Sequence, residues 1–326
     1  DRPEAEILKR YCETVAYYPR ITGFISQLSL KPYIVVSRRS EMLLKNLLND
    51  NYPILFEGLH SCYYLDHKAL KGRTLIYRES NIEHDYYFNL FKSERSLGRK
   101  LFFLAESLKL RLYQKQLQHS TRMLVVSQTD RDYLAAKFPR KDVVYLPSFH
   151  GNNEVKSLPG KGNYVLYHGN LSVGENLLAA QYLVKEVFND LPVKFKIAGL
   201  NPPASLRGLV ALHPNMELIP NPPQTEMEQL IKNAQVNILV TFQATGLKLK
   251  LLNTLYNGRW MLVNREMLAG TGLESLCEIA ADADEMKKKI ISLFDTEFDQ
   301  KQLGARAEIL QSRFSDEQNA RSLIRE

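Results

Sequence analysis

The sequence is poor in cysteine and has no long apolar run. Its three cysteines, Cys12, Cys62 and Cys277, are far apart and show no metal-ligand spacing, which indicates buried thiols in a reducing compartment and no zinc site. No apolar stretch approaches the roughly 20 residues of a membrane-spanning helix. We therefore expect a globular, cytoplasmic protein that binds no metal.

Two common phosphate-binding signatures are missing as well. The segment YHGNLSVGEN, residues 167–176, follows an expected strand and holds two glycines. It lacks the Gly-Lys-Ser/Thr ending of the Walker A motif and the G-x-G-x-x-G spacing of dinucleotide-binding enzymes. Its backbone N–H groups can still approach a phosphate, but the loop alone does not identify a ligand.

The sequence does have an excess of basic charge and enough apolar residues for two domains. The formal charge of +7 and the pI near 9.1 favour anionic partners, which include nucleotides, nucleic acid and an acidic membrane surface. With 326 residues, 44% of them hydrophobic, the chain can fill two cores.

Short apolar segments alternate with helical patterns along the whole chain. This order predicts an α/β fold in which parallel sheets are covered by helices. Expected strands are 14–18, 34–36, 53–57, 74–77, 123–127, 143–146, 164–168, 193–198, 216–219 and 236–240. Expected helices are 40–48, 94–118, 130–137, 176–188, 225–234 and 282–294, with further closing helices after residue 299.

A linker is predicted at residues 151–162, GNNEVKSLPGKG, because this segment is polar, rich in glycine and proline, and without periodicity. It separates a first domain, residues 1–150, from a second, residues 163–326. The chain opens on a helical segment, so we expect the first domain to lack its initial strand or strands. Whether the last helix packs back on the first domain stays open.

The expected helix at 94–118 has a basic amphipathic pattern. Its apolar stripe and its cations are Leu97, Leu101, Leu104, Leu108 and Leu112, and Arg95, Arg99, Lys100, Lys109, Arg111 and Lys115. Such a helix can lie on anionic lipid, or its leucines can pack on the domain's own sheet with the cations in water. The pattern therefore leaves peripheral contact with the inner face of a membrane open.

Polar residues cluster after two expected strands of the first domain. They are His60, after strand 53–57, and Arg78, Asn81, Glu83 and His84, after strand 74–77. The carboxyl ends of parallel strands border the crevice where ligands bind, so we expect these side chains to face such a crevice. Helix capping and ordinary surface polarity are the alternative for each of them.

The segment TFQATGLKLKLLNTLYNGRWMLVN, residues 241–264, predicts a strand end, a glycine turn, a short helix and a second strand. Lys248 and Lys250 lie beside a helix start near Gly246. Unpaired N–H groups and partial positive charge at a helix N-terminus can receive a diphosphate. A surface helix with solvated lysines is the alternative.

Taken in order, these segments resemble the GT-B glycosyltransferases, and among them the retaining family 4 group. The resemblance covers most of the chain and rests on the linker, the glycine loop at 167–176, and the segment RESNIEHDYYFNLFKSE followed by a basic helix. It also rests on GLKLKLLNTLYNGRWMLVN, which is similar to the family's pattern of Gly, Lys, Leu, an acidic residue, an Ala-rich turn and Gly before a Val-rich strand.

The resemblance implies two Rossmann-like domains facing a cleft. It further implies transfer of a mannose- or glucose-type hexose from a GDP- or UDP-linked donor to a polysaccharide or glycolipid, with retention and without metal or other cofactor. A nucleic-acid binder that uses the basic charge is a third hypothesis, which we disfavour, so we expect no nucleic-acid partner. The residues implied for the donor are Gly169, Asn170, Ser172, Gly246, Lys248 and Lys250, with Asn253 at the ribose. Gly199 and Asn221 are donor-side candidates for a different reason: they follow expected strand ends in proline-stiffened loops that can offer backbone groups to a base, with simple turn chemistry as the alternative. The residues implied for the acceptor side are His60, Asn81, Glu83 and His84.

The sequence departs from the family at four places. Asn170 and Glu175 stand where the family carries Arg and Lys, and Thr245 and Asn253 replace two glutamates eight positions apart. Lys248 and Lys250 can supply the missing positive charge, because lysine acts as a compact point charge for phosphate. The alternative is therefore a catalytically impaired protein that still binds a sugar nucleotide.

Overall fold

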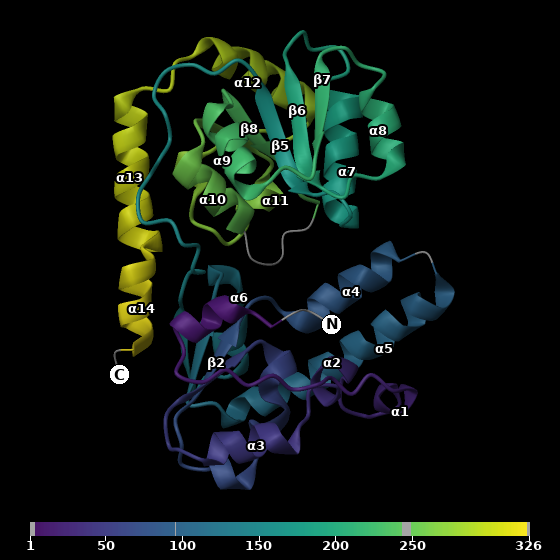
Figure 1. Ribbon diagram of the computed structural model, residues 1–326, viewed down its shortest axis with the longest axis vertical. Helices are drawn as coiled ribbons and strands as arrows, with labels where there is room; N and C mark the ends of the chain where they lie inside the picture. The colour runs from purple at the N-terminus through teal and green to yellow at the C-terminus, as the bar shows by residue number, and fades with distance from the viewer. Residues whose placement is uncertain (1–3, 95, 243–248, 325–326) are drawn as a thin grey trace. The chain divides into compact units, whose positions relative to one another are not determined.

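The computed structural model describes residues 4–94, 96–242 and 249–324. The chain forms two compact units, which comprise Asp1–Val126 with Asp130–Tyr145 (unit 1) and Ser127–Thr129 with Leu146–Glu326 (unit 2). Each unit holds one parallel sheet with helices packed against it (Figure 1). The α/β fold with two parallel sheets that the alternating pattern predicts is thus confirmed.

The sheet of unit 1 has the strand order β1-β2-β3-β4, and every neighbouring pair is parallel. Its strands are β1 (Ile54–Glu57), β2 (Leu75–Glu79), β3 (Arg122–Val125) and β4 (Asp142–Tyr145). Phe56 lies opposite Tyr77, and Tyr77 opposite Met123, so these buried side chains form a row across the sheet. The carboxyl ends of all these strands meet at one edge.

The helices of unit 1 are short except for α4 and α5. They are α1 (Phe24–Gln27), α2 (Tyr33–Val36), α3 (Glu41–Leu48), α4 (Glu83–Ser93), α5 (Leu97–Tyr113) and α6 (Gln128–Lys137), with 3-10 turns at Glu6–Arg10, Leu59–Tyr64, Lys68–Leu70 and Gln114–His119. The sequence analysis missed α4, because residues 81–84 there look like a polar loop.

Two strands expected near the start of the chain are wrong. Residues 14–18 are irregular, and their tyrosines bond outside any sheet: Tyr17 accepts from the Ala5 N–H, and Tyr18 from Asn46 Nδ2. Residues 34–36 lie in α2, where Val35 is buried. The β-branched residues of both segments indicated strands, but a strand forms only where a neighbouring strand pairs with it. Residues 34–36 are buried in a short helix, and residues 14–18 form no regular element.

The leucine stripe of α5 does not pack on the sheet. Leu97, Leu101, Leu108 and Leu112 are 78%, 66%, 56% and 70% exposed. The buried side of the helix is the opposite one, where Leu110 joins the core of unit 1. The interpretation in which these leucines cover the domain's own sheet is therefore wrong for these four, because the helix turns its other face to the core.

The sheet of unit 2 has the order β10-β9-β8-β5-β6-β7 and is parallel throughout. Its strands are β5 (Val165–Asn170), β6 (Phe195–Leu200), β7 (Met216–Pro220), β8 (Val236–Leu239), β9 (Trp260–Val263) and β10 (Glu278–Ile279). The chain moves outward from β5 through β6 to β7, then returns to the other side of β5 and continues through β8. The strand order therefore reverses between β5 and β8.

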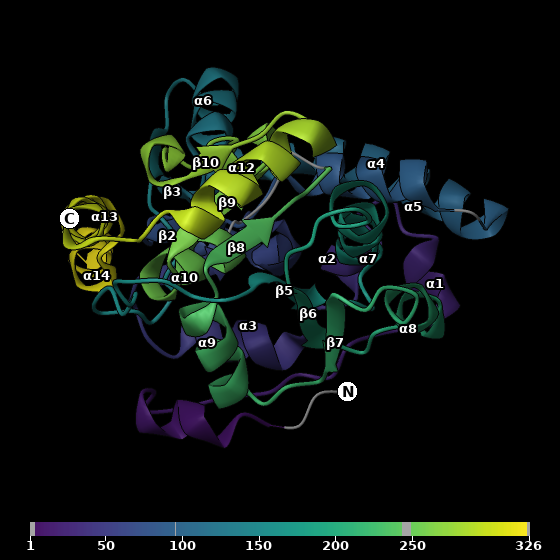
Figure 2. The ribbon, with the colours of Figure 1, turned by 90° about the horizontal axis from the view of Figure 1, so that it is seen from above.

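Helices cover both faces of this sheet, as Figure 2 shows from above. The helices of unit 2 are α7 (Gly174–Tyr182), which continues into a π-helical turn at Leu183–Val187, α8 (Ala204–Val210), α9 (Gln224–Asn233), α10 (Leu249–Asn257), α11 (Arg265–Leu268), α12 (Ala283–Asp295), α13 (Gln300–Phe314) and α14 (Asp316–Ile324). Tyr167 and Ile197 pack with α7 and α12, while Leu166 and Ala198 pack with α9. Successive strand residues thus point to opposite, equally buried faces.

The segment at 151–162 is bonded to unit 2 along much of its length. The Lys156 N–H donates to the Tyr256 carbonyl (2.6 Å), and the Ser157 hydroxyl donates to the Gly258 carbonyl (2.6 Å). Gly160 and Phe298 exchange backbone hydrogen bonds. This polar segment therefore runs as a fixed strap over α10 within unit 2.

Candidate functional site

The strand reversal of unit 2 creates a binding edge between β5 and β8. In parallel sheets, ligands bind outside the carboxyl ends of the strands where the order reverses. β5 ends at Asn170 and leads into α7, and β8 leads to Thr241. The Thr241 hydroxyl donates to the carboxylate of Glu175 in the first turn of α7, so the two connections meet at this point.

Glycine is required where β5 and β6 approach each other at this edge. A Cβ atom on Gly199 would lie 1.8 Å from the carbonyl oxygen of Gly169, and one on Gly169 would lie 3.3 Å from the Asn176 side chain. No side chain fits at Gly199 without moving the backbone. Gly199 is therefore required by the closeness of β5 and β6, whereas Gly169 makes room for Asn176 of α7.

Polar side chains after β5 are linked to a cation from α10. Asn170 Oδ1 accepts from the Ser172 N–H (3.1 Å) and hydroxyl (2.7 Å), while Asn176 Nδ2 donates to the Asn170 carbonyl (3.0 Å). Lys250 Nζ donates to Asn176 Oδ1 (3.3 Å) and lies 5.0 Å from the centre of the Tyr167 ring. The N-terminus of α7 has no side-chain cap, so helix N–H groups and an ammonium group share one edge.

The buried side chain of His168 is linked by hydrogen bonds to the first turn of α10. His168 Nε2 lies 2.9 Å from the Thr254 hydroxyl, which itself donates to the Lys250 carbonyl (2.7 Å). Because the hydroxyl has only one proton, its oxygen must accept from Nε2–H, so Nε2 carries a proton. Burial, with the charge of Lys250 adding to it, lowers the pKa of His168 to about 3.

The remaining donor-side residues of the prediction are spread more widely. Asn221 has a left-handed backbone (φ 52°), and its Oδ1 accepts from the Asn201 N–H (2.7 Å), which fixes the loop after β6. Asn253 Oδ1 accepts from Asn152 Nδ2 (2.8 Å) of the 151–162 strap. Gly246 and Lys248 lie outside the described residues.

The carboxyl edge of unit 1 brings His60 and Glu83 together. His60 Nδ1 lies 3.1 Å from Glu83 Oε1, and the His60 side chain is 36% exposed whereas that of Glu83 is only 7% exposed. Gly58 (φ 73°) makes room for this pair, since a Cβ atom there would lie 2.6 Å from the imidazole ring. A buried carboxylate that accepts from Nδ1–H leaves Nε2 as the free acceptor of a partly exposed histidine.

A second buried carboxyl group lies behind this pair. Glu79 accepts from the Tyr77 hydroxyl (2.5 Å) and from the Asn81 N–H (3.2 Å). Burial, and next the neighbouring Glu83, raise the pKa of Glu79 well above its usual range. Two acidic groups with different surroundings therefore stand side by side at this edge.

Several polar atoms of this edge are buried without a hydrogen-bond partner in the described part of the chain: Asn81 Oδ1, Glu83 Oε2 and His84 Nδ1. Such atoms are rare in folded proteins and mark places where water or a ligand completes the bonding. His84 itself lies on α4 beside the Tyr133 ring, 6.1 Å between centres, and burial lowers its pKa. Glu83 and His84 are thus buried residues in the first turn of α4, directly after the end of β2.

The sequence analysis missed several residues that build these edges. Glu79 ends β2 on the same face as Leu75 and Tyr77, so the alternation of the strand was a signal of its burial that the sequence analysis did not use. Asn176 was visible in the glycine loop, yet only the fold brings it to Lys250 from a helix 74 positions later. Gly58 follows a strand and stands two positions before His60, so the sequence indicated a glycine turn that positions a polar side chain, although we did not use this signal.

No group of three or more His, Cys, Asp and Glu side chains within residues 4–94, 96–242 and 249–324 is arranged to hold a metal ion. Within the same ranges, no helix has both the length and the apolar character needed to cross a membrane.

Comparison with known proteins gives distant but consistent similarities. No family model matches the sequence. Over 304 residues the chain is 23% identical to an uncharacterized 44.6 kDa protein in the cps region of Klebsiella pneumoniae, covering 88% of this chain and 76% of that protein.

Solved structures of glycosyltransferases share the fold. TarM matches with a TM-score of 0.62 at 11% identity, covering 87% of this chain and 56% of TarM. The trehalose-6-phosphate synthase OtsA matches with a TM-score of 0.60 at 10% identity, covering 86% of this chain and 73% of OtsA. This chain thus spans little more than half the length of TarM. Its two parallel α/β sheets have the fold of the GT-B glycosyltransferases.

Proposed function

We propose that this protein transfers a mannose- or glucose-type hexose from a GDP- or UDP-linked donor to a polysaccharide or glycolipid acceptor, with retention of configuration and without a metal ion. The fold it shares with glycosyltransferases supports this class of reaction. One structural neighbour, a Staphylococcus aureus TarM mutant, was crystallised with fondaparinux, alpha-GlcNAc-glycerol and UDP, and another is described as a UDP-forming trehalose-phosphate synthase.

The observation that carries the proposal is the uncapped N-terminus of α7 with Lys250 bonded to Asn176 in its first turn. The leaving diphosphate of a sugar nucleotide develops negative charge as the glycosidic bond breaks. Fixed N–H donors and an ammonium group stabilise such charge without having to reorganise. In this proposal Gly169, Asn170 and Ser172 line the diphosphate, as do Gly246 and Lys248, which lie outside the described residues.

The other donor-side residues have separate roles in the proposal. Gly199 and Asn221 shape the loops that receive the nucleoside, and Asn253 bonds the ribose hydroxyls. A bond to the ribose requires Asn253 to share or exchange its present partner, Asn152.

On the acceptor side, the proposal is that His60 binds the acceptor hydroxyl that attacks the sugar. The Glu83 carboxylate orients the imidazole through Nδ1, so Nε2 can accept a hydrogen bond or a proton from that hydroxyl. Asn81 and His84 complete the acceptor side, because each has a buried polar atom that a ligand or water can satisfy. Retention needs no protein nucleophile if the leaving phosphate assists the attack, and glycosyl transfer with retention has been studied in trehalose-6-phosphate synthase.

A second candidate function is sugar-nucleotide binding without transfer. Two observations favour it: the Glu175 carboxylate occupies the first turn of α7, where it opposes a diphosphate, and Asn253 is already paired with Asn152. A carboxylate beside a diphosphate lowers affinity through like-charge repulsion. The enzyme and the binding protein differ in one measurable product, the nucleoside diphosphate that only transfer or hydrolysis releases.

The first test is a thermal-shift screen of the chain with GDP, UDP, ADP and their sugar conjugates. A ligand that binds only the folded state raises the melting temperature by mass action. We expect one nucleotide to stabilise the protein, and Lys250→Ala to weaken its binding by about 10- to 100-fold, as for loss of a charged hydrogen bond. Lys196→Ala is the matched control, because Lys196 also lies over a tyrosine ring, 4.8 Å from the centre of Tyr164, but near the amino end of β6.

The results separate the two candidates. Nucleoside diphosphate release that increases with added acceptor supports the enzyme, and stabilisation without release under any acceptor supports the binding protein. If no nucleotide stabilises the chain, or if Lys196→Ala weakens binding as much as Lys250→Ala, the donor site does not lie at the β5–β8 edge.

A further inference from the structure

The exposed leucine stripe of α5, defined here as Leu97, Leu101, Leu108 and Leu112, is an apolar surface on a helix whose other face is already buried. At 100° per residue these leucines fall within about 60° of one another around the helix axis, so they form one continuous strip. More than half of each side chain is exposed. A strip of this kind on a folded unit marks an interaction surface.

The charge along this strip has one sign. Between Leu97 and Lys115 the only acidic residue is Glu106. Glu106 is buried, and its carboxylate accepts from Lys109 Nζ (2.9 Å) and from the Tyr33 N–H (2.6 Å), so it faces the inside of the unit. The cations of the same stretch are Arg99, Lys100, Lys109, Arg111 and Lys115. On the helical projection, Lys100 and Arg111 border one side of the strip.

Neighbouring segments extend the surface with aromatic and apolar groups. Figures 1 and 2 show α4 beside α5. On α4 the rings of Phe88 and Phe91 stack at 5.6 Å, and Lys92 and Lys100 lie over them at 4.7 and 5.2 Å. Aromatic rings combined with lysines suit the boundary between water and a bilayer, because one end of each group is apolar and the other polar.

We propose that this surface binds an anionic lipid bilayer, with α5 lying parallel to the membrane plane. The leucines would enter the boundary between headgroups and acyl chains, and the flanking cations would meet anionic headgroups. A second copy of the chain suits the surface less well. In a symmetric pair the same patch faces its copy, so the cations of one copy would be brought towards those of the other. This inference does not depend on sugar transfer.

The test is co-sedimentation of the full chain with vesicles of phosphatidylcholine and phosphatidylglycerol at 3:1, compared with phosphatidylcholine alone. We expect binding to the anionic vesicles and little to the neutral ones. The double variant Leu101→Gln with Leu108→Gln should bind at least about tenfold more weakly, because it removes apolar groups that enter the bilayer. Leu178→Gln with Leu212→Gln is the control, since both leucines are exposed in unit 2.

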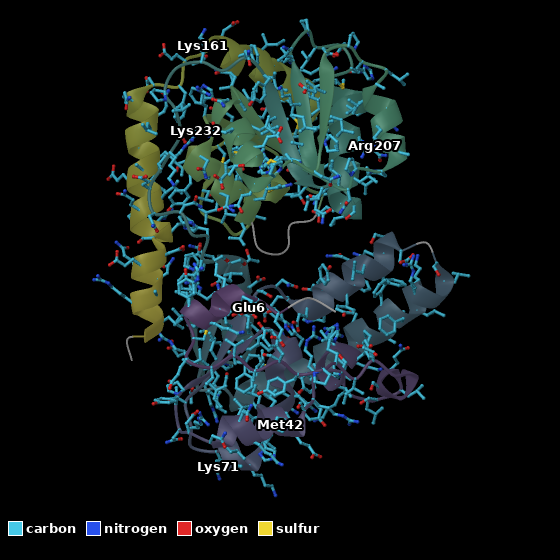
Figure 3. The ribbon with its side chains drawn as sticks, viewed as in Figure 1. Glu6, Met42, Lys71, Lys161, Arg207 and Lys232 are labelled. Atoms are coloured by element: carbon cyan, nitrogen blue, oxygen red, sulfur yellow. The ribbon has the colours of Figure 1, made fainter. Side chains whose placement is uncertain are left out.

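The electrostatic part has its own variants. Lys100→Gln with Arg111→Gln should weaken binding about fivefold for each cation removed, and this contribution should shrink at high salt. Lys161→Gln with Lys301→Gln removes the same charge from exposed positions of unit 2, where Figure 3 labels Lys161, and should leave binding unchanged. Circular dichroism of every variant checks that it is folded.

Three results would overturn the proposal. The parent protein does not bind anionic vesicles, the leucine pair and its control bind equally well, or light scattering detects a dimer that the leucine pair dissociates in the absence of lipid. The last result would identify a second copy as the partner of the strip.

Discussion

The carboxyl edges of the two sheets are built differently. In unit 2, the polar groups at this edge are bonded to one another, as in the links from Lys250 to Asn176 and from Thr241 to Glu175. In unit 1, buried polar atoms of Glu83 and His84 have no partner within the described residues. The first edge has fixed donors that can hold charge, whereas the second has titratable groups that can exchange a proton. Under the proposed function, donor binding would use the bonded edge of unit 2 and acceptor activation the edge of unit 1, so the two tasks would place opposite demands on an edge.

The sheets also differ in topology. The strand order of unit 2 reverses between β5 and β8, while the described strands of unit 1 follow one another without a reversal. A reversal separates the two connections beside it and leaves room for a ligand. Unit 2 therefore has a binding edge by topology alone, and unit 1 relies on the left-handed Gly58 to make room for His60.

The largest expected effect comes from His60. His60→Ala should lower kcat by about 10²- to 10⁴-fold, as for loss of a general base, while the thermal shift caused by the donor nucleotide stays unchanged. His119→Ala, at an exposed position of the same unit, is the control and should be silent. If His60→Ala also abolishes the thermal shift caused by the nucleotide, the proposal that the two edges have separate roles in donor binding and acceptor activation is wrong.

A smaller but still large effect is expected from packing between β5 and β6 of unit 2. Gly199→Ala should lower the free energy of unfolding of unit 2 by about 3 kcal/mol, because its Cβ atom has no room beside Gly169. Gly174→Ala meets open space, so we expect a change below about 1 kcal/mol. Urea unfolding followed by fluorescence of Trp260, the only tryptophan, which lies in β9, reports on unit 2. Equal effects of the two variants would show that the close approach of β5 and β6 is dispensable.

The smallest predicted effect is a pH dependence that belongs to unit 2. His168 has a pKa of about 3 in the folded protein and about 6.5 when unfolded, so the unfolded chain binds its proton first as the pH falls. Stability should therefore be lost from about pH 6.5 downward, at about 1.4 kcal/mol per pH unit and about 2 kcal/mol by pH 5. The same Trp260 signal measures this slope.

His168→Gln should reduce that slope, whereas His119→Gln, which removes an exposed imidazole of unit 1, should not. A parent protein with flat stability between pH 7 and pH 5 would contradict the neutral, buried state of His168. An equal reduction by both variants would show that the slope does not arise from His168.

Much of the fold could be predicted from the sequence because it depends on local patterns. The strands β1 to β9 follow from short apolar runs, and the turn before β9 follows from Gly258, whereas the two-residue strand β10 was not expected. The errors occur where local preference and tertiary packing disagree. Residues 14–18 have strand-forming side chains but no neighbour to pair with, and the leucines of α5 have the pattern of a packed stripe although the core takes the other face.

The candidate site, like the fold, has features that the sequence determines and others that depend on the tertiary structure. The sequence by itself determined which chemical groups follow which strand: His60 after β1, Asn81 and Glu83 after β2, and Asn170 after β5. It could not determine which of them meet, since hydrogen bonds such as those between His60 and Glu83 or Lys250 and Asn176 join residues far apart in the chain. Those contacts, and the burial that shifts the pKa values of Glu79 and His168, were decided only by the tertiary structure, because desolvation and hydrogen bonding depend on distance in space and not on position in sequence.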